Sequence, residues 1–139
     1  LKKNNRIKLH MIGHLQSNKA KEAVSIFSYI HSLDSEKLAN VLCKEEKIAN
    51  KRIKYFIQVN IANEKQKSGI SEDLVDDFIR YTINDLNLDV IGLMCIPPLN
   101  QNPTPFFLLL KSCNISLQLV PFFYPLMPLI SFQVLQVKI

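Results

Sequence analysis

Short apolar runs alternate with longer amphipathic stretches along the first 111 residues of the chain. The runs have the length and the β-branched or aromatic content of buried strands, and we predict four of them: Leu9–Ile12, Tyr29–Ser32, Lys54–Ile61 and Asp89–Ile96. The stretches between them predict helices over about residues 18–27, 35–49 and 71–86, with a further helical start near 106–111. This alternation is typical of parallel strands joined by crossover helices. The sequence therefore predicts an α/β fold of about four βα units.

Two of the predicted helices show which face they bury. In the helix after Ser35, apolar residues recur at helical spacing: Leu38, Val41, Leu42 and Ile48. This pattern leaves Glu45 and Glu46 on the outward face. The helix after Ser71 has an equivalent stripe: Leu74, Val75, Phe78 and Ile79. Ser35 and Ser71 both stand where a hydroxyl can cap the first turn of a helix.

The last part of the chain departs from this pattern. Residues 112–137 include no charged side chain, and Pro121, Pro125 and Pro128 interrupt their apolar run. The run is long enough for a membrane span of ~20 residues, but three prolines disfavour a continuous spanning helix. We therefore predict a folded unit over residues 1–111 and a separate apolar tail over residues 112–139.

The charged residues and cysteines exclude several classes of function. The formal net charge is +5, from 17 Lys and Arg against 12 Asp and Glu, but the two signs are interspersed, as in Lys44-Glu45-Glu46-Lys47. Interspersed charge is typical of a solvated surface, so we expect no nucleic-acid partner. Cys43, Cys95 and Cys113 form no Cys-x-x-Cys pair, and the charged start lacks an apolar leader. We therefore expect reduced thiols and a cytoplasmic protein.

Two histidines have a spacing that can bind zinc on a helix. His10 and His14 are four residues apart, but Gly13 and the strand pattern around His10 break helical geometry. A third ligand does not stand nearby in the sequence. We therefore predict no metal site.

Polar residues after the predicted strands carry a resemblance to a known family. The stretch Ile12–Lys19 reads Ile-Gly-His-Leu-Gln-Ser-Asn-Lys, and four further blocks follow in order: His31–Asp34, Ile57–Ile61, Lys67–Ile70 and Gly92–Pro98. Together these blocks resemble the pyridoxal phosphate homeostasis protein family, whose fold is the alanine racemase-like barrel. The resemblance runs from about Leu9 to about Lys111. It implies a partial (β/α)8 TIM barrel that holds the family's third to sixth strands.

The resemblance also implies a cofactor, pyridoxal phosphate (PLP), and a carrier role with no catalytic activity. In the family, a lysine at the end of the first strand forms the Schiff base, and a phosphate loop and an arginine come from the last two strands. We expect the Schiff-base lysine upstream of Leu1, and we find neither the phosphate loop nor the arginine in the tail. This chain would therefore keep only one wall of the site. The residues implied for that wall are Met94 beside the ring, Asn60, Ser32, His10, and Lys67 near the phosphate.

Each of these residues also has a plainer interpretation. Met94 and His10 could be ordinary core residues, Asn60 and Lys67 could serve a solvated loop, and Ser32 could simply precede the Ser35 cap.

Three interpretations of the whole chain follow. The first is a fragment of a PLP homeostasis protein that cannot bind PLP covalently, with a tail produced by a shifted reading frame. The second is a remnant of an alanine racemase-type enzyme, which would need an acid or base from a second domain. The third is a membrane-attached module, which depends on the tail alone. A half barrel leaves strand edges at Leu9–Ile12 and Val90–Ile96, unless the tail or a second copy covers them, so we also expect low stability or self-association.

Overall fold

Four parallel strands form the centre of the structure. The computed structural model describes residues 8–62, 67–98, 101–106, 108, 118–121 and 134–138. The parallel strands are β1 (His10–Met11), β2 (Tyr29–Leu33), β3 (Lys54–Asn60) and β5 (Asp89–Met94), and they lie side by side in that order. A short strand, β4 (Ile70–Ser71), pairs in parallel with the end of β3.

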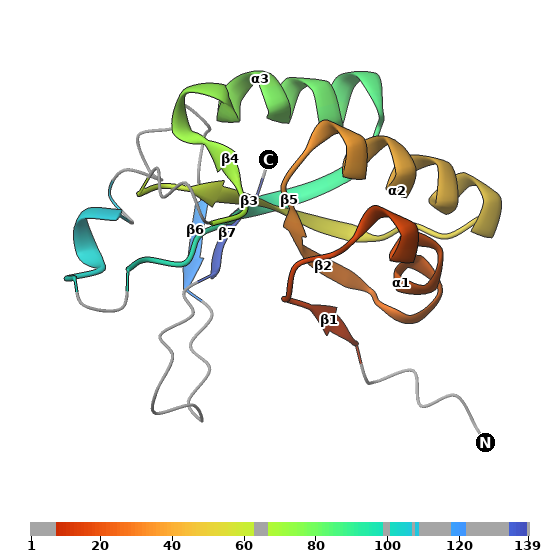
Figure 1. Cartoon of the computed structure of the whole chain (residues 1–139), viewed down its shortest axis with the longest axis horizontal. Coiled ribbons are helices and arrows are strands. Elements are labelled where there is room, and N and C mark those ends of the chain that lie inside the picture. Colours follow the sequence, from red (N-terminus) through yellow and green to blue (C-terminus); the bar gives the residue numbers. More distant parts are fainter. Residues whose placement is uncertain are drawn as a thin grey trace.

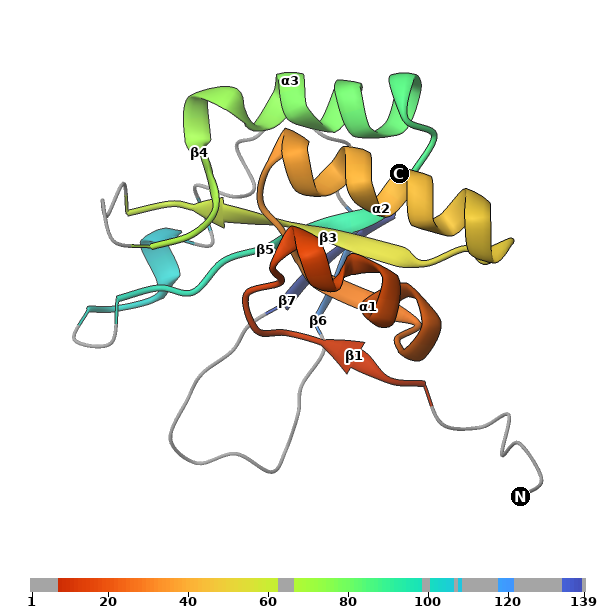
Figure 2. The same ribbon diagram turned by 45° about the vertical axis from the view of Figure 1, so that its right-hand side comes forward.

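The helices cover one face of this sheet, as Figures 1 and 2 show. They are α1 (Ala20–Ile26), α2 (Glu36–Ala49) and α3 (Val75–Arg80). A 3₁₀ turn precedes α1 at Ser17–Lys19 and α3 at Glu72–Leu74, and a π-helical turn, Tyr81–Asp85, follows α3. The predicted βα order is confirmed, and the arrangement corresponds to part of a barrel, with its helices outside and the opposite sheet face inside.

The helix-facing side of the sheet forms the hydrophobic core. Side chains alternate along a strand, so Tyr55, Ile57 and Val59 of β3 all point to the helices and are buried. Helix α2 packs Leu38 and Leu42 against them, and α3 adds Val75 and Phe78. The core therefore lies between the helices and β2, β3 and β5.

Four details of the helix predictions need correction. Ile48 and Leu74, expected on buried faces, are 65% and 53% exposed. Ile48 lies off the face of α2 that Leu38, Leu42 and Glu46 bury, and Leu74 belongs to the 3₁₀ turn before α3, which buries no residue. Glu46, expected to point outward, is 4% exposed. Ser35 does cap α2, since its Oγ accepts the Leu38 N–H at 3.4 Å, whereas the side chain of Ser71 accepts no capping hydrogen bond.

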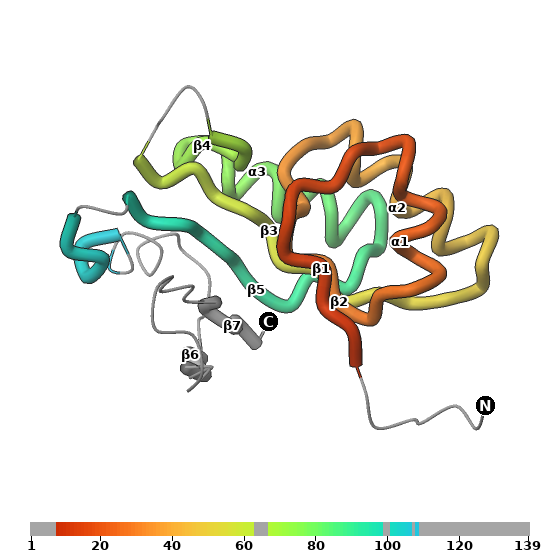
Figure 3. Tube along the Cα trace, turned by 60° about the horizontal axis from the view of Figure 1, so that its bottom comes forward, coloured from red at the N-terminus to blue at the C-terminus, as the bar shows by residue number. Residues whose placement is uncertain are grey.

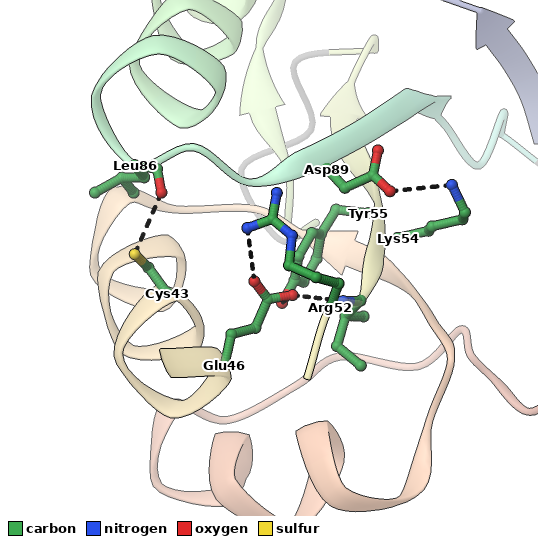
Figure 4. A network of polar contacts seen from close by, with 8 residues as sticks. Cys43, Glu46, Arg52, Lys54, Tyr55, Leu86 and Asp89 are labelled. Carbon is green, nitrogen blue, oxygen red and sulfur yellow. Dashed lines mark hydrogen bonds and ion pairs between the residues drawn. The ribbon is translucent and has the colours of Figure 1, made fainter. Parts of the chain in front are cut away.

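The buried carboxylate of Glu46 ties the end of α2 to the start of β3 (Figure 4). Its Oε1 accepts the Ile53 N–H at 2.5 Å and the Tyr55 hydroxyl at 3.1 Å, and its Oε2 lies 3.5 Å from the Arg52 guanidinium. Burial raises the pKa of Glu46 above its ordinary value, although all three of these partners oppose that shift. The carboxylate thus satisfies two buried donors at the amino-terminal end of the sheet.

Lys51, in the turn between α2 and β3, closes the end of α1. Its ammonium donates to the carbonyls of Val24, Ser25 and Phe27 at 2.6, 3.1 and 2.9 Å. These carbonyls belong to the last turn of α1, where a positive charge also stabilises the helix dipole. Asn50 precedes Lys51 in the left-handed region, with φ of 47°, and ends α2.

Two short segments of the tail extend the sheet. Strand β7 (Val134–Lys138) pairs antiparallel with β5, and β6 (Gln118–Pro121) pairs antiparallel with β7. The β5 edge, expected to stay open unless covered, therefore has a neighbour. Most of the tail, most of the helical start near 106–111 and the first seven residues lie outside the described residues. The boundary proposed at residue 111 stays a prediction.

Candidate functional site

The inner face of the sheet, opposite the helices, carries imidazole, aromatic and polar side chains. On β3, Phe56 and Gln58 alternate with the core residues, and strand register sets Gly92 and Met94 of β5 beside them. The imidazole of His31 stacks on Phe56 with ring centroids 4.3 Å apart. In a curved sheet with helices outside, this face corresponds to the barrel interior. The tube in Figure 3 shows the strands that form it, from β1 to β5.

Four of the five residues predicted from the sequence lie toward the carboxyl ends of the strands. Met94 ends β5 and is 1% exposed, Asn60 ends β3 and is half-buried, and Ser32 is the buried next-to-last residue of β2. The Ser32 Oγ is buried and has no hydrogen-bond partner among the described residues. Lys67 is exposed in the loop after β3.

The charge of Lys67 acts on the buried thiol of Cys95. Burial raises the pKa of Cys95 to about 12, and the positive charge of Lys67 opposes this shift. Cys95 directly follows Met94, but its side chain belongs to the helix-facing core, whereas Met94 lies on the inner face.

His10, the fifth predicted residue, lies at the other end of the sheet. It pairs in register with Tyr29, Tyr29 pairs with Lys54, and Lys54 pairs with Asp89; these are the first residues of their strands. Its Nδ1 lies 2.9 Å from the Nε2 of His31, and its ring stacks on Tyr29 with centroids 4.2 Å apart. The structure therefore separates His10 from the other four residues.

A polar cluster at the carboxyl ends of the strands escaped the sequence reasoning. His14 follows β1, Asp34 follows β2 and Ser68 lies in the loop after β3; the His14 Nδ1 is 3.3 Å from the Asp34 carboxylate and 3.4 Å from the Ser68 Oγ. Both contacts use the same ring nitrogen, whereas a catalytic triad places the serine and the acid on opposite nitrogens. The cluster thus ties three loops together without activating Ser68. Its signal in the sequence was a polar residue soon after each strand.

An open hollow of about 370 Å³ adjoins this cluster. Its lining is mostly polar: His14, Leu15, Gln16, Ser17, Asn18, Asp34, Ser35, Lys37 and Leu38. Within the described parts of the chain, no three His, Cys, Asp or Glu side chains come together to hold a metal ion. The helices among those residues are too short or too polar to cross a bilayer.

The chain is similar in sequence to curated proteins over most of its length. No protein-family model matches the chain. The curated pyridoxal phosphate homeostasis protein of Aquifex aeolicus is 36% identical over 112 residues, which cover 78% of this chain and 49% of that protein. The homologue from Synechocystis, with the same name, is 38% identical over 98 residues, covering 70% of this chain and 44% of its own length.

Solved structures give the same relationship. PipY of Synechococcus elongatus, solved with PLP bound, superposes with a TM-score of 0.61 at 28% identity, covering 71% of this chain and 45% of PipY. An alanine racemase of Clostridium difficile shares the fold alone, with a TM-score of 0.55 at 12% identity over 78% of this chain and 29% of the racemase. The α/β architecture is thus part of an alanine racemase-like barrel. The chain, which spans about half the length of the curated relatives it matches, is similar over that part to proteins of the pyridoxal phosphate homeostasis family.

Proposed function

We propose that the chain supplies one wall of a PLP site and acts as a carrier component in PLP homeostasis, without catalysing a reaction. The observation that carries this proposal is the placement of Met94. It is buried at the carboxyl end of β5 but lies on the inner face, apart from the helix-facing core. Ligand sites of barrel proteins lie at this end of the strands. The homologues named above support PLP as the ligand.

Other residues of the wall would contact different parts of the cofactor. The sulfur of Met94 would lie against the ring, since thioethers make favourable contacts with aromatic faces. Asn60 and Ser32 would hydrogen-bond polar groups or waters around it, and Lys67 would attract the phosphate. His10, at the opposite end of its strand, would contribute only through His31.

We further propose that this 139-residue chain does not hold PLP as a Schiff base. Lys54 is the one lysine within strands β1 to β5. It lies at the amino-terminal end of β3, where its ammonium is 3.0 Å from the Asp89 carboxylate. The position is thus far along the strand from Met94 and already paired. The free, buried thiols of Cys43 and Cys95 support a cytoplasmic site of action.

A titration with PLP tests the wall. With methionine methyl groups labelled with carbon-13, the Met94 resonance should shift as PLP saturates the chain, because ring currents act at short range. Met11, half-buried on β1, is the internal control and should not move. Lys67→Gln should weaken binding several-fold, whereas Lys47→Gln, in the last turn of α2, should leave it unchanged. An unmoved Met94 at saturating PLP would contradict the wall.

Borohydride reduction tests the covalent part of the proposal. We expect scattered, substoichiometric labelling of exposed lysines and no defined aldimine absorbance band. A stoichiometric adduct trapped on a single lysine would show that the chain forms its own Schiff base. That adduct would refute the absence of a Schiff base, but it would not contradict the contact of PLP with Met94.

A further inference from the structure

Two histidines on adjacent strands make a direct hydrogen bond inside the barrel face. His10 Nδ1 and His31 Nε2 are 2.9 Å apart, with ring centroids 5.2 Å apart and planes tilted by 40°. Tyr29 stacks on the far side of His10 and Phe56 on that of His31, so the four rings form a continuous row. Such a bond needs one nitrogen with a proton and one without, so it cannot form when both rings are fully protonated.

The surroundings of the pair favour its neutral form. His31 is 4% exposed, and its second nitrogen, Nδ1, is buried with no hydrogen-bond partner among the described residues. The ammonium of Lys8 lies over Tyr29, 5.9 Å from the ring centroid. On β3 and β5, the nearest charges are Lys54 and Asp89, which pair with each other at 3.0 Å. At the other end of the strands, Asp34 is paired with His14. A proton added to the pair would therefore bring a buried charge without its own counterion.

Strand β1 has few other attachments to the sheet. It comprises two residues, and its ladder with β2 joins His10 to Tyr29 and Met11 to Ile30. The Leu9 carbonyl also accepts the N–H groups of Ser28 and Tyr29 at 2.9 and 3.2 Å. Leu9 and Ile12, on either side of β1, are 46% and 43% exposed and add little buried area. The His10–His31 bond thus acts together with these backbone bonds, the stacking of His10 on Tyr29 and the packing of Met11 against the core to hold β1.

We propose that the His10–His31 pair is an acid-sensitive latch: when neutral it holds β1 on the sheet, and when both rings are protonated it releases β1 together with the loop that carries His14. The released loop would break the contacts of His14 with Asp34 and Ser68 and so open the carboxyl-terminal mouth. The latch does not depend on the identity of the ligand.

The direction of the pH effect follows from proton linkage. Burial, and then the charge of His10, lower the pKa of His31 from 6.5 to about 4, and burial followed by Lys8 lowers that of His10. The released state therefore binds protons more readily than the latched state. Between about pH 6.5 and 4, the docking equilibrium should fall up to ~tenfold per pH unit for each proton taken up.

Amide hydrogen exchange tests the latch in the full chain. The amides of Ser28 and Tyr29 report on β1, because they are bonded to the Leu9 carbonyl. After correction for intrinsic exchange, we expect their protection to fall by at least ~tenfold between about pH 7 and 5. Leu42, inside α2, is the control for global unfolding and should keep its protection. If the protection of the Ser28, Tyr29 and Leu42 amides changes equally with pH, the proposal is overturned.

Two variants separate the latch from a general effect of histidine protonation. His10→Gln retains hydrogen-bonding groups but cannot be protonated, and it should flatten the pH dependence at Ser28 and Tyr29. His14→Gln is the matched control and should leave that dependence unchanged; a loss there instead would refute the latch. If His10→Gln does not fold, nitrogen-15 NMR of the wild-type imidazoles decides. His10 and His31 should titrate together and below pH 6.5, and independent titration near pH 6.5 would refute the proposal.

Discussion

Removing the Glu46 carboxylate should be among the most damaging single changes in the described part of the chain. Glu46→Ala leaves the Ile53 N–H and the Tyr55 hydroxyl without their acceptor, and both residues are fully buried. An orphaned buried donor costs roughly 1–3 kcal/mol, so the two together predict a loss of about 2–6 kcal/mol in the free energy of unfolding. A small domain has a total of about 5–15 kcal/mol. The variant should therefore be marginally folded.

The partners of Glu46 should differ sharply in their contributions. Tyr55→Phe removes one hydrogen bond to a charged acceptor and should cost about 1.5–3 kcal/mol. Arg52→Ala should cost about 0–1 kcal/mol, because the Arg52 side chain is 58% exposed and its ion pair is screened by water. Glu46→Ala combined with Tyr55→Phe should cost less than the sum of the two, since phenylalanine leaves no orphaned hydroxyl.

Urea denaturation followed by circular dichroism measures all four variants near neutral pH. A loss below about 1 kcal/mol for Glu46→Ala, or a larger loss for Arg52→Ala, would refute the reasoning from buried donors. The pH dependence gives a further check. Because burial raises the pKa of Glu46, the folded state holds this proton more tightly than the unfolded chain. Stability from this group is present below its unfolded pKa and is lost as pH rises through the folded value. Glu46→Gln should abolish that component.

Three further predictions use changes with matched controls. Lys51→Met removes the ammonium from three carbonyls at the end of α1 and should lower the free energy of unfolding, measured with urea, by about 2 kcal/mol. Lys47→Met, at an exposed position of α2, should change it by no more than about 0.5 kcal/mol. Equal losses for the two variants would contradict the capping role of Lys51. Gly69→Ala should lower the melting temperature, because a Cβ there would lie 2.7 Å from the Asn60 nitrogen and φ is +130°. Gly13→Ala is the control and should leave the melting temperature unchanged, because among the described residues no atom beyond its chain neighbours lies within 4 Å of its Cβ position. An unchanged melting temperature for Gly69→Ala would disprove the close approach. The outer edge of β1, which pairs with no strand among the described residues, should promote self-association, and Ile12→Lys should reduce it in sedimentation velocity at equal concentration; a wild-type chain that stays monomeric at all concentrations would rule this out.

The strand–helix order could be read from the sequence because each element has a strong period. Five of the eight residues from Lys54 to Ile61 are β-branched or aromatic, and β3 occupies almost the whole of this run. The buried faces near helix ends were less certain, since Ile48 lies beside the face that α2 buries and Leu74 belongs to a 3₁₀ turn and not to α3.

The candidate site was predicted only in part, for a physical reason. Met94, Asn60 and Ser32 were recognised from their position near strand ends. The bond of His10 to His31 depends instead on how two strands align, and that of Glu46 to Ile53 on how the turn after α2 folds back; a single sequence states neither. A glutamate at helical spacing is normally outward because burial of its charge is unfavourable. The local sequence does not indicate that the Ile53 N–H and the Tyr55 hydroxyl will donate to its carboxylate.

The three-carbonyl contact of Lys51 limits how this polypeptide can be divided for experiments. The residue that seals the first helix is contributed by the turn that follows the second, so the opening βα modules are interdependent. A piece cut after β2 would expose the frayed terminus of α1 to solvent, even though every residue of that helix were still present. The smallest excised portion with an intact first helix must therefore extend at least through Lys51.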